Sequence, residues 1–165
     1  MLQPMAGPAR LRELLAAGRL LVAPGVYDGL SARIAEQAGF EVLYVSGGAV
    51  ARSMGLPDVG LVSLTETAKR VEEIRAVTSG PLVVDADTGY GNELNVIRTV
   101  RTLERAGAAA IHLEDQVTPK KCGHYQGHQL IEAEAMVRKI RAALDARQDP
   151  NLLIIARTDA RSAAG

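Results

Sequence analysis

Five short apolar runs recur along the chain, and a longer amphipathic stretch separates most of them from the next. The runs cover Leu20 to Ala23, Val42 to Val45, Leu82 to Val84, Ala110 to Leu113 and Leu152 to Ala156. Short runs without polar alternation predict parallel strands that are covered on both faces of a sheet. The amphipathic stretches predict helices at Arg10 to Ala17, Leu30 to Ala38, Leu64 to Val77, Leu94 to Ala106 and Glu132 to Ala146. The pattern therefore predicts an α/β fold of repeated β/α units.

Residues that begin and end helices stand where this interpretation needs them. Ser63 is followed three residues later by Glu66, which is the spacing of a capping box. Gly18, Gly39 and Gly107 come just after three of the predicted helices, where glycine commonly ends a helix. The local signals thus support the same β/α order.

Polar residues at the ends of several strands indicate which α/β fold to expect. No G-x-G-x-x-G follows the first run, and convergence from many strand ends favours a (β/α)8 TIM barrel over a doubly wound sheet. A complete barrel takes roughly 250 residues, whereas this chain has 165. We expect residues 1–165 to form one partial barrel domain, truncated after strand five and covering about the first five β/α units. A complete five-stranded domain is the alternative.

Composition narrows the class of partner. Nineteen Lys and Arg balance nineteen Asp and Glu, and they are spread along the chain instead of forming a basic stripe. This distribution argues against nucleic acid or an acidic membrane and favours a small molecule. We found no apolar run near 20 residues and no charged-then-apolar leader, and a single cysteine cannot form an internal disulfide. We therefore expect a cytoplasmic protein.

Three acidic residues follow two consecutive predicted strands. Asp85 and Asp87 are two residues apart after Leu82 to Val84, so both carboxylates are expected on the same side of the strand. Glu114 ends the next strand at the equivalent place. Oxygen ligands favour a hard ion such as Mg²⁺. The alternative is that these are solvated loop carboxylates or helix caps.

The single cysteine lies in a charged loop. Cys122 follows Lys120 and Lys121 and precedes His124 by two residues. A thiol beside ammonium groups and an imidazole is expected to have a lowered pKa, which makes Cys122 a candidate proton donor or acceptor. The alternatives are a buried small hydrophobe and a Cys-His nucleophile pair. Zinc is a poor candidate because paired cysteines are missing.

Two further segments are candidates for substrate binding. Ser46-Gly47-Gly48 follows a predicted strand as a turn whose hydroxyl and backbone N–H groups suit a carboxylate or an oxyanion. The stretch from Ala51 to Gly60 has the composition of a mobile loop. Asp58 in this loop is interpreted as a gate residue, a base or a turn former.

Arg157 ends the fifth predicted strand. Its guanidinium suits a bidentate bond to a substrate carboxylate, and a salt bridge with Asp159 is an equally good interpretation. His112 lies inside a predicted strand and is expected to be structural.

Taken together, these segments resemble the isocitrate lyase and phosphoenolpyruvate mutase superfamily, in its branch of 2-methylisocitrate and 2,3-dimethylmalate lyases. The resemblance runs from about Pro24 to Asp159. It rests on Tyr44-Val45-Ser46-Gly47-Gly48, Gly55-Leu56-Pro57-Asp58, Val84 to Gly91, Ile111 to Gln116, Lys120 to His124 and Ala156 to Asp159. Lys120-Lys121-Cys122-Gly123-His124 matches the signature of the family.

The resemblance implies the fold and the roles of the site residues. The fold would be a (β/α)8 barrel, and the metal would be Mg²⁺, or Mn²⁺, at Asp85, Asp87 and Glu114. The implied substrate-binding residues are Tyr44, Ser46, Gly47, Gly48, Asp85, Cys122, Gly123, His124 and Arg157. The implied catalytic residues are Cys122, Asp58, Lys120, His124 and Arg157. The full-length protein would be a homotetramer.

The resemblance also implies a reaction. A 2-hydroxy di- or tricarboxylate would be cleaved by retro-aldol or Claisen chemistry to an α-keto acid such as pyruvate and a carboxylate, with Cys122 as the acid. The mutases typically carry Asn at the position of Cys122, which favours a lyase. The alternatives are an oxaloacetate decarboxylase or hydrolase, a carboxyphosphonoenolpyruvate phosphonomutase, and an inactive fragment that only binds Mg²⁺ and an α-keto acid.

Overall fold

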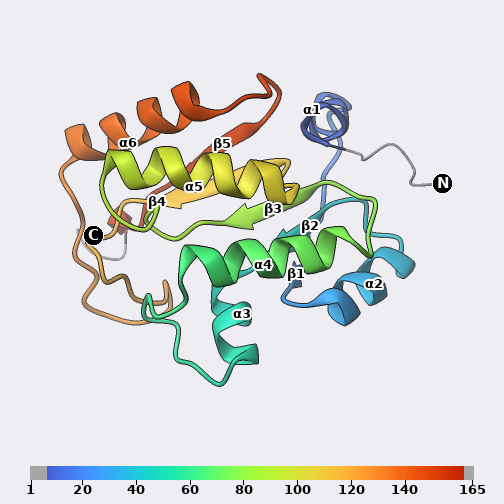
Figure 1. The fold of residues 1–165 in the computed structure, drawn as a ribbon, viewed down its shortest axis with the longest axis horizontal. Helices are drawn as coiled ribbons and strands as arrows, with labels where there is room; N and C mark the ends of the chain where they lie inside the picture. Colours follow the sequence, from blue (N-terminus) through green and yellow to red (C-terminus); the bar gives the residue numbers. More distant parts are fainter. Residues whose placement is uncertain (1–6, 162–165) are drawn as a thin grey trace.

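The alternating pattern of the sequence folds into one parallel sheet with helices packed against it. A computed structural model describes residues 7–161, in which five strands pair in parallel in the order β1-β2-β3-β4-β5 (Figure 1). The strands are β1 (Gly25–Val26), β2 (Leu43–Val45), β3 (Leu82–Asp85), β4 (Ala110–Glu114) and β5 (Leu153–Arg157). The helices are α1 (Pro8–Ala16), α2 (Gly29–Gln37), α3 (Gly47–Ser53), α4 (Leu64–Arg75), α5 (Glu93–Ala106) and α6 (Ala133–Ala146). Strands that neighbour in sequence also neighbour in space, as in consecutive units of a (β/α)8 barrel.

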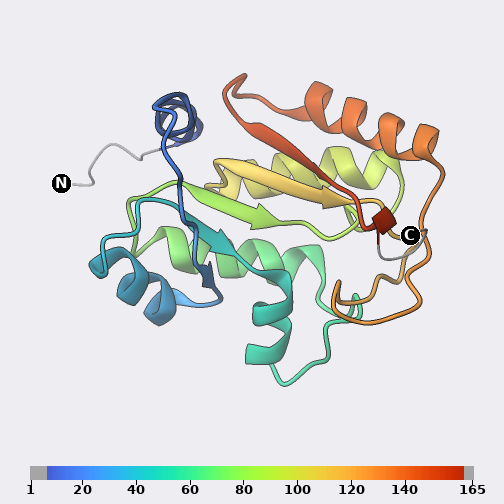
Figure 2. The ribbon, with the colours of Figure 1, turned by 180° about the vertical axis from the view of Figure 1, so that it is seen from behind.

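Helices α4, α5 and α6 cover one face of the sheet. Figure 1 shows them in front of the strands, and Figure 2 shows the strands in front of the helices when the molecule is seen from behind. Helix α5 packs against both α4 and α6. The core between the layers is aliphatic and includes Val71, Ile74, Leu82, Val84, Val100, Leu103, Ile111 and Leu113. Each such buried side chain stabilises the fold by about 1.5–3 kcal/mol.

Helix α1 closes the amino ends of the strands. Leu11 and Leu14 on its buried side form a small cluster with Val42, Ala109 and Ala110. These three residues stand at or just before the starts of β2 and β4. The opposite end of the sheet, where the strands finish, is therefore the end available for a site.

Three helices begin with the capping that their sequences favour. The Asp28 side chain accepts a hydrogen bond from the Ser31 N–H at the start of α2. Asn92 caps α5 in the same way. The predicted capping box of Ser63 and Glu66 is confirmed at the start of α4. These caps satisfy backbone N–H groups that the first turn of a helix leaves unpaired.

The predicted first strand is wrong. Leu20 to Ala23 is not part of the sheet, and Leu20 and Val22 are largely exposed. The strand lies at β1 instead, because β1 pairs with β2 through Gly25 and Tyr44. The apolar run therefore ends before the part of the chain that the sheet can pair.

Helix α3 was not predicted. It occupies Gly47–Ser53, where the sequence indicated a turn and the start of a mobile loop. The Ser46 side chain accepts a hydrogen bond from the Ala49 N–H and so begins the helix directly after β2. All five predicted helices are confirmed, as α1, α2, α4, α5 and α6. No helix within residues 7–161 is both long and apolar enough to cross a bilayer.

Candidate active site

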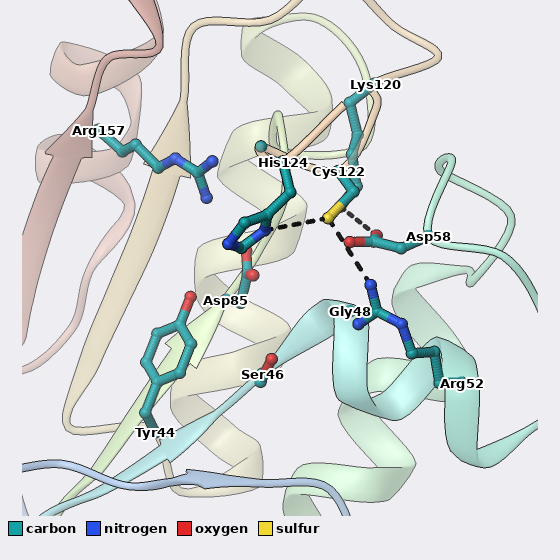
Figure 3. Close-up of a pocket in the computed structure, with 11 residues that line it drawn as sticks. Tyr44, Ser46, Gly48, Arg52, Asp58, Asp85, Lys120, Cys122, His124 and Arg157 are labelled. Atoms are coloured by element: carbon teal, nitrogen blue, oxygen red, sulfur yellow. Dashed lines mark hydrogen bonds and ion pairs between the residues drawn. The ribbon is translucent and has the colours of Figure 1, made fainter. Parts of the chain in front are cut away.

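A pocket of about 460 Å³ opens at the carboxyl ends of the strands (Figure 3). Its wall combines the ends of β2, β3 and β5 with α3, the loop after α3 and the loop after β4. The lining residues are Tyr44, Ser46, Gly48, Arg52, Asp58, Asp85, Lys120, Cys122, Gly123, His124 and Arg157. All five predicted catalytic residues are among them. Of the predicted binding and metal residues, Gly47, Asp87 and Glu114 do not line this pocket.

Asp85 ends β3 and receives donors from two directions. Its Oδ2 accepts a hydrogen bond from the Gly47 N–H at 3.3 Å, and its Oδ1 accepts one from the Asp87 N–H at 3.1 Å. His112 Nδ1 lies 3.7 Å from Asp85 Oδ1 and 3.1 Å from the Tyr44 hydroxyl. Burial opposes ionisation of Asp85, but His112 and the other donors outweigh it and lower the pKa to about 2.

His112 thus lies closer to the site than the sequence indicated. It was expected to be structural, and it does bridge two strands through Tyr44 on β2 and Asp85 on β3. The strand pairing explains this position, because His112 is the register partner of Asp85. An imidazole in this place orients two pocket residues at once.

Asp87 reaches the site by a turn. The expectation that Asp85 and Asp87 share a strand face is wrong, because β3 ends at Asp85 and Asp87 has a φ of 47° in the left-handed region. Aspartate tolerates this conformation better than most residues.

Lys139 on α6 contacts the same turn. Its buried ammonium group donates a hydrogen bond of 2.9 Å to the backbone carbonyl of Thr88, the residue after Asp87. Lys139 was not predicted because one lysine in an amphipathic helix gives no signal.

Lys120 is buried between two carboxylates. Its Nζ lies 2.5 Å from Asp58 Oδ1 and 2.8 Å from Asp87 Oδ1. Burial alone lowers the pKa of this ammonium, but the two carboxylates more than reverse the effect and raise it above its ordinary value. Burial and the nearby Asp85 raise the pKa of Asp87 to about 6, although Lys120 opposes the shift.

Arg157 pairs with two carboxylates at the end of β5. Its Nη1 lies 3.2 Å from Glu114 Oε2, and its Nε donates to Asp159 Oδ1 at 3.0 Å. The salt bridge with Asp159, one of the two interpretations of Arg157, is therefore confirmed. Burial raises the pKa of Glu114 to about 8 despite the charges of Arg157 and Lys120. A Cβ on Gly123 would lie 2.3 Å from Arg157 Nη2, so glycine leaves room for this guanidinium.

The three predicted metal ligands do not form a coordination cluster in the part of the chain that the structure describes. No group of three His, Cys, Asp or Glu residues among residues 7–161 is placed to hold a metal ion. Asp87 Oδ1 and Glu114 Oε1 are buried oxygens without a hydrogen-bond partner, although Lys120 forms an ion pair with the former. All the candidate donors are carboxylate oxygens, which suit Mg²⁺. The donor chemistry fits this ion, while cationic side chains neutralise two of the three acids.

Cys122 is buried, but its surroundings are polar. Its sulfur lies 3.6 Å from His124 Nδ1 and 3.7 Å from Arg52 Nη2 (Figure 3). The two lysines expected beside it make their contacts elsewhere: Lys120 with the carboxylates, and Lys121 with the Gly127 carbonyl. The cation that touches the thiol is therefore an arginine from another element.

Arg52 is the pocket residue that the sequence interpretation missed. It belongs to α3, and its place in the pocket follows only once Gly47–Ser53 is helical. A Cβ on Gly48 would lie 2.7 Å from Asp58 Oδ2 and 3.0 Å from Arg52 Nη1. The missing side chain at Gly48 lets both charged groups approach the pocket.

The fold and the pocket agree with the comparisons to known proteins. The phosphoenolpyruvate phosphomutase family model matches residues 11–164, so the chain belongs to this family of enzymes. It is 56% identical over 155 residues to 2-methylisocitrate lyase of Aeropyrum pernix, covering 94% of this chain and 50% of that protein. It is 48% identical over 158 residues to 2,3-dimethylmalate lyase of Eubacterium barkeri, covering 95% and 55%. The chain spans about half the length of the relatives it matches.

Solved structures show the same likeness. Phosphoenolpyruvate phosphomutase from Streptomyces platensis subsp. rosaceus superposes with a TM-score of 0.93 at 38% identity, covering 96% of this chain and 55% of that one. An oxaloacetate acetylhydrolase in complex with 3,3-difluorooxalacetate gives 0.92 at 39% identity, covering 98% and 57%. A phosphonopyruvate hydrolase with oxalate and Mg²⁺ gives 0.88 at 36%, covering 96% and 54%. The predicted superfamily and the predicted fold class are confirmed.

Proposed function

We propose that the full-length protein is a Mg²⁺-dependent carbon–carbon lyase for a 2-hydroxy di- or tricarboxylate of the 2-methylisocitrate or 2,3-dimethylmalate type. The observation that carries the proposal is the buried thiol of Cys122, which lines the same pocket as Asp85 and Arg157. A lyase needs a proton donor for the carbanion that cleavage leaves. The two curated relatives named above are lyases.

In this proposal Asp85, Asp87 and Glu114 hold Mg²⁺, with Mn²⁺ as the alternative. When bound, the ion lowers the pKa of the substrate hydroxyl and offsets the charge of its carboxylate. The support in this chain is the all-oxygen donor set, together with the buried Glu114 Oε1, which lacks a hydrogen-bond partner. One structural relative was solved with Mg²⁺.

The other pocket residues then orient the substrate. Ser46, Gly47 and Gly48, with Tyr44, receive the 2-hydroxy acid end, and Arg157 neutralises its carboxylate. Gly123 and His124 close the other side of the site beside Cys122. Closure over the substrate excludes water and protects the carbanion.

Cleavage then moves one proton at each end of the breaking bond. Asp58 is the proposed base that takes the proton of the 2-hydroxyl group. The C2–O bond becomes a carbonyl as the C2–C3 bond breaks. The electron pair of the broken C2–C3 bond remains on C3, where the adjacent carboxylate delocalises it as an enediolate. The Cys122 Sγ–H donates its proton to C3. An α-keto acid and a carboxylate leave.

Substitution of the thiol tests this function. We expect full-length wild-type protein with Mg²⁺ to release pyruvate from 2-methylisocitrate or 2,3-dimethylmalate, or glyoxylate from isocitrate. Cys122→Ala should lower kcat by about 10²–10⁴-fold, the usual contribution of a positioned proton donor. Lys121→Ala is the matched control in the same loop, because that exposed lysine donates to Gly127 outside the pocket. A wild type that cleaves none of the three acids contradicts the lyase proposal.

A second candidate is cleavage of oxaloacetate. The observation that favours it is the TM-score of 0.92 to an oxaloacetate acetylhydrolase solved with 3,3-difluorooxalacetate. Wild-type protein that forms acetate and oxalate from oxaloacetate, or releases CO₂ in a reaction that survives loss of Cys122, would favour this candidate. A phosphonate product would instead favour the phosphonomutase alternative. The homotetramer stays a prediction.

A further inference from the structure

Arg52 is a pocket cation to which the proposed chemistry has so far given no role. It stands in the last turn of α3 and is an exposed residue. Within residues 7–161 it forms no ion pair with a carboxylate, whereas Arg157 pairs with Glu114 and Asp159. Its guanidinium reaches the Cys122 sulfur at 3.7 Å. A guanidinium has five N–H donors, so most of these donors remain available for a ligand.

The two arginines enter the pocket from opposite sides. Figure 3 shows Arg157 and Arg52 facing each other across the pocket, with His124 and Cys122 between them. Each guanidinium lies against a glycine: a Cβ on Gly123 would lie 2.3 Å from Arg157 Nη2, and a Cβ on Gly48 would lie 3.0 Å from Arg52 Nη1. The pocket thus carries a guanidinium at each end of one cavity, and that of Arg157 is shared with Glu114 and Asp159. Such an arrangement suits a ligand with an anionic group at each end.

We propose that Arg52 binds the carboxylate on the carbon that Cys122 protonates, and so selects substrates that carry a second carboxylate at that carbon. This proposal rests on the proposed function, either as cleavage of a 2-hydroxy acid or as hydrolysis of oxaloacetate to acetate and oxalate. In both of these reactions the C2–C3 bond breaks, and the electron pair remains on a carbon that bears a carboxylate.

The geometry follows from the position of the sulfur. A carbon that takes the proton of Cys122 must approach Sγ to about 3–3.5 Å. Its carboxylate oxygens are two bonds away, and Arg52 Nη2 lies 3.7 Å from the same sulfur. The guanidinium is therefore within reach of those oxygens. Two N–H groups on one carboxylate would stabilise the charge that develops there as the bond breaks.

Two ligands can test the two ends of the pocket separately. Oxalate resembles the α-keto acid half, whereas 3,3-difluorooxaloacetate also carries a carboxylate on the carbon next to the keto group. Calorimetry on the Mg²⁺-loaded full-length protein should show that Arg52→Gln weakens 3,3-difluorooxaloacetate about tenfold or more and leaves oxalate affinity within about twofold. Arg52→Lys should recover part of the loss, because it keeps the charge but not the planar fork. Arg101→Gln, which removes an exposed arginine of α5, should change neither affinity.

The outcomes separate this inference from the function it rests on. Oxalate binding by Arg52→Gln shows that the variant has folded with its α-keto acid end intact. Equal losses for both ligands, no loss for either, or a wild type that binds oxalate but not 3,3-difluorooxaloacetate would overturn the role of Arg52 alone. A wild type that does not bind oxalate would overturn the proposed function and this inference with it.

Discussion

At the residue scale, the pocket depends on cations that neutralise buried carboxylates. Lys120 lies between Asp58 and Asp87, and Arg157 lies between Glu114 and Asp159. Each cation comes from a segment far in sequence from at least one of its partners. Taking a charge out of water costs free energy, and the opposite charge must recover it. The pairs therefore hold together segments that the backbone alone would not bring into contact.

Removing Lys120 should strongly destabilise the protein. Lys120→Met leaves Asp58 and Asp87 buried without their cation, and we expect the free energy of unfolding to fall by about 3–5 kcal/mol. Urea denaturation of the full-length protein at pH 7 without metal would measure the loss. Lys121→Met makes the same change at an exposed neighbour and should cost less than about 1 kcal/mol. Similar losses for both variants would show that the ion pairs contribute little.

The sequence indicated which residues line the pocket better than it indicated what they contact. Asp85 and Arg157 could be predicted because the ends of parallel strands converge. Cys122 could be predicted because a single thiol stood among charged residues. The contact of Arg52 with that thiol depends on the path of α3, and the pairing of Lys120 with Asp58 depends on where two loops meet. Periodicity carries no information about either.

At the scale of elements, the β/α order could be read from the sequence because the central strands β2, β3 and β4 are short, largely buried apolar runs separated by amphipathic helices. The first strand was misplaced because Leu20 to Ala23 has the composition of a strand but no partner in the sheet. Helix α3 was missed because two glycines at its start predict a turn, while the Ser46 cap that overrides them is weak in sequence. Tertiary pairing decided the first case, and in the second the Ser46 cap acts together with the burial of Val50 and Ala51.

Helix α4 should be sensitive to its capping box. The Ser63 hydroxyl accepts a hydrogen bond from the Glu66 N–H, and the Glu66 carboxylate accepts one from the Ser63 N–H. Ser63→Ala should lower the free energy of unfolding by about 1 kcal/mol. Thr65→Ala, two residues later on the exposed side of α4, should leave stability unchanged or raise it slightly because alanine favours helix. Chemical denaturation of the two variants side by side would reveal whether the cap matters.

Glu36 links α2 to the loop before β3 and should make stability depend on pH. Its Oε1 accepts hydrogen bonds from the Ser79 N–H and the Gly80 N–H. Burial raises the pKa of this carboxyl, but the hydrogen bonds outweigh burial, so the pKa is lowered on folding. A lowered pKa stabilises the fold above the unfolded value of about 4.3, and this stabilisation is lost as the pH falls through the folded value.

Glu36→Gln should therefore be less stable than the wild type at pH 7, with a difference that shrinks as the pH falls below about 4. Urea denaturation of both proteins between pH 7 and pH 3 would measure it. Glu72→Gln, on the exposed surface of α4, controls for the loss of a surface charge. A difference that stays constant over this range would rule out the ionised carboxylate as the cause.

At the scale of the whole molecule, the sheet has two unpaired edges within the described residues. β1 and β5 are the outer strands, and apolar side chains near these edges are exposed, with Leu30 at 70%, Ile34 at 58% and Ile155 at 38%. Unpaired edges and exposed apolar groups promote association with other chains. The relatives that the chain matches are about twice as long as the chain.

A chain of these 165 residues alone should therefore self-associate. We expect light scattering to report species larger than a monomer at micromolar concentration, and the double change Leu30→Ser and Ile34→Ser to reduce their size. Calorimetry with Mg²⁺ and pyruvate on the same sample would test whether the chain by itself binds these two ligands without turnover. A monodisperse monomer with a cooperative unfolding transition would contradict this prediction.

The position of Lys120 has a thermodynamic consequence for any divalent cation that binds Asp87. The ammonium lies 2.8 Å from Asp87 Oδ1, so it already interacts with the carboxylate that would bind such a cation. Two positive charges at one carboxylate repel, so a cation at Asp87 weakens the hold of Lys120 on the acids. Because coupling between two equilibria is reciprocal, withdrawal of Lys120 must strengthen cation binding by the same factor. The affinity of the pocket for cations therefore depends on how strongly Lys120 is held by Asp87.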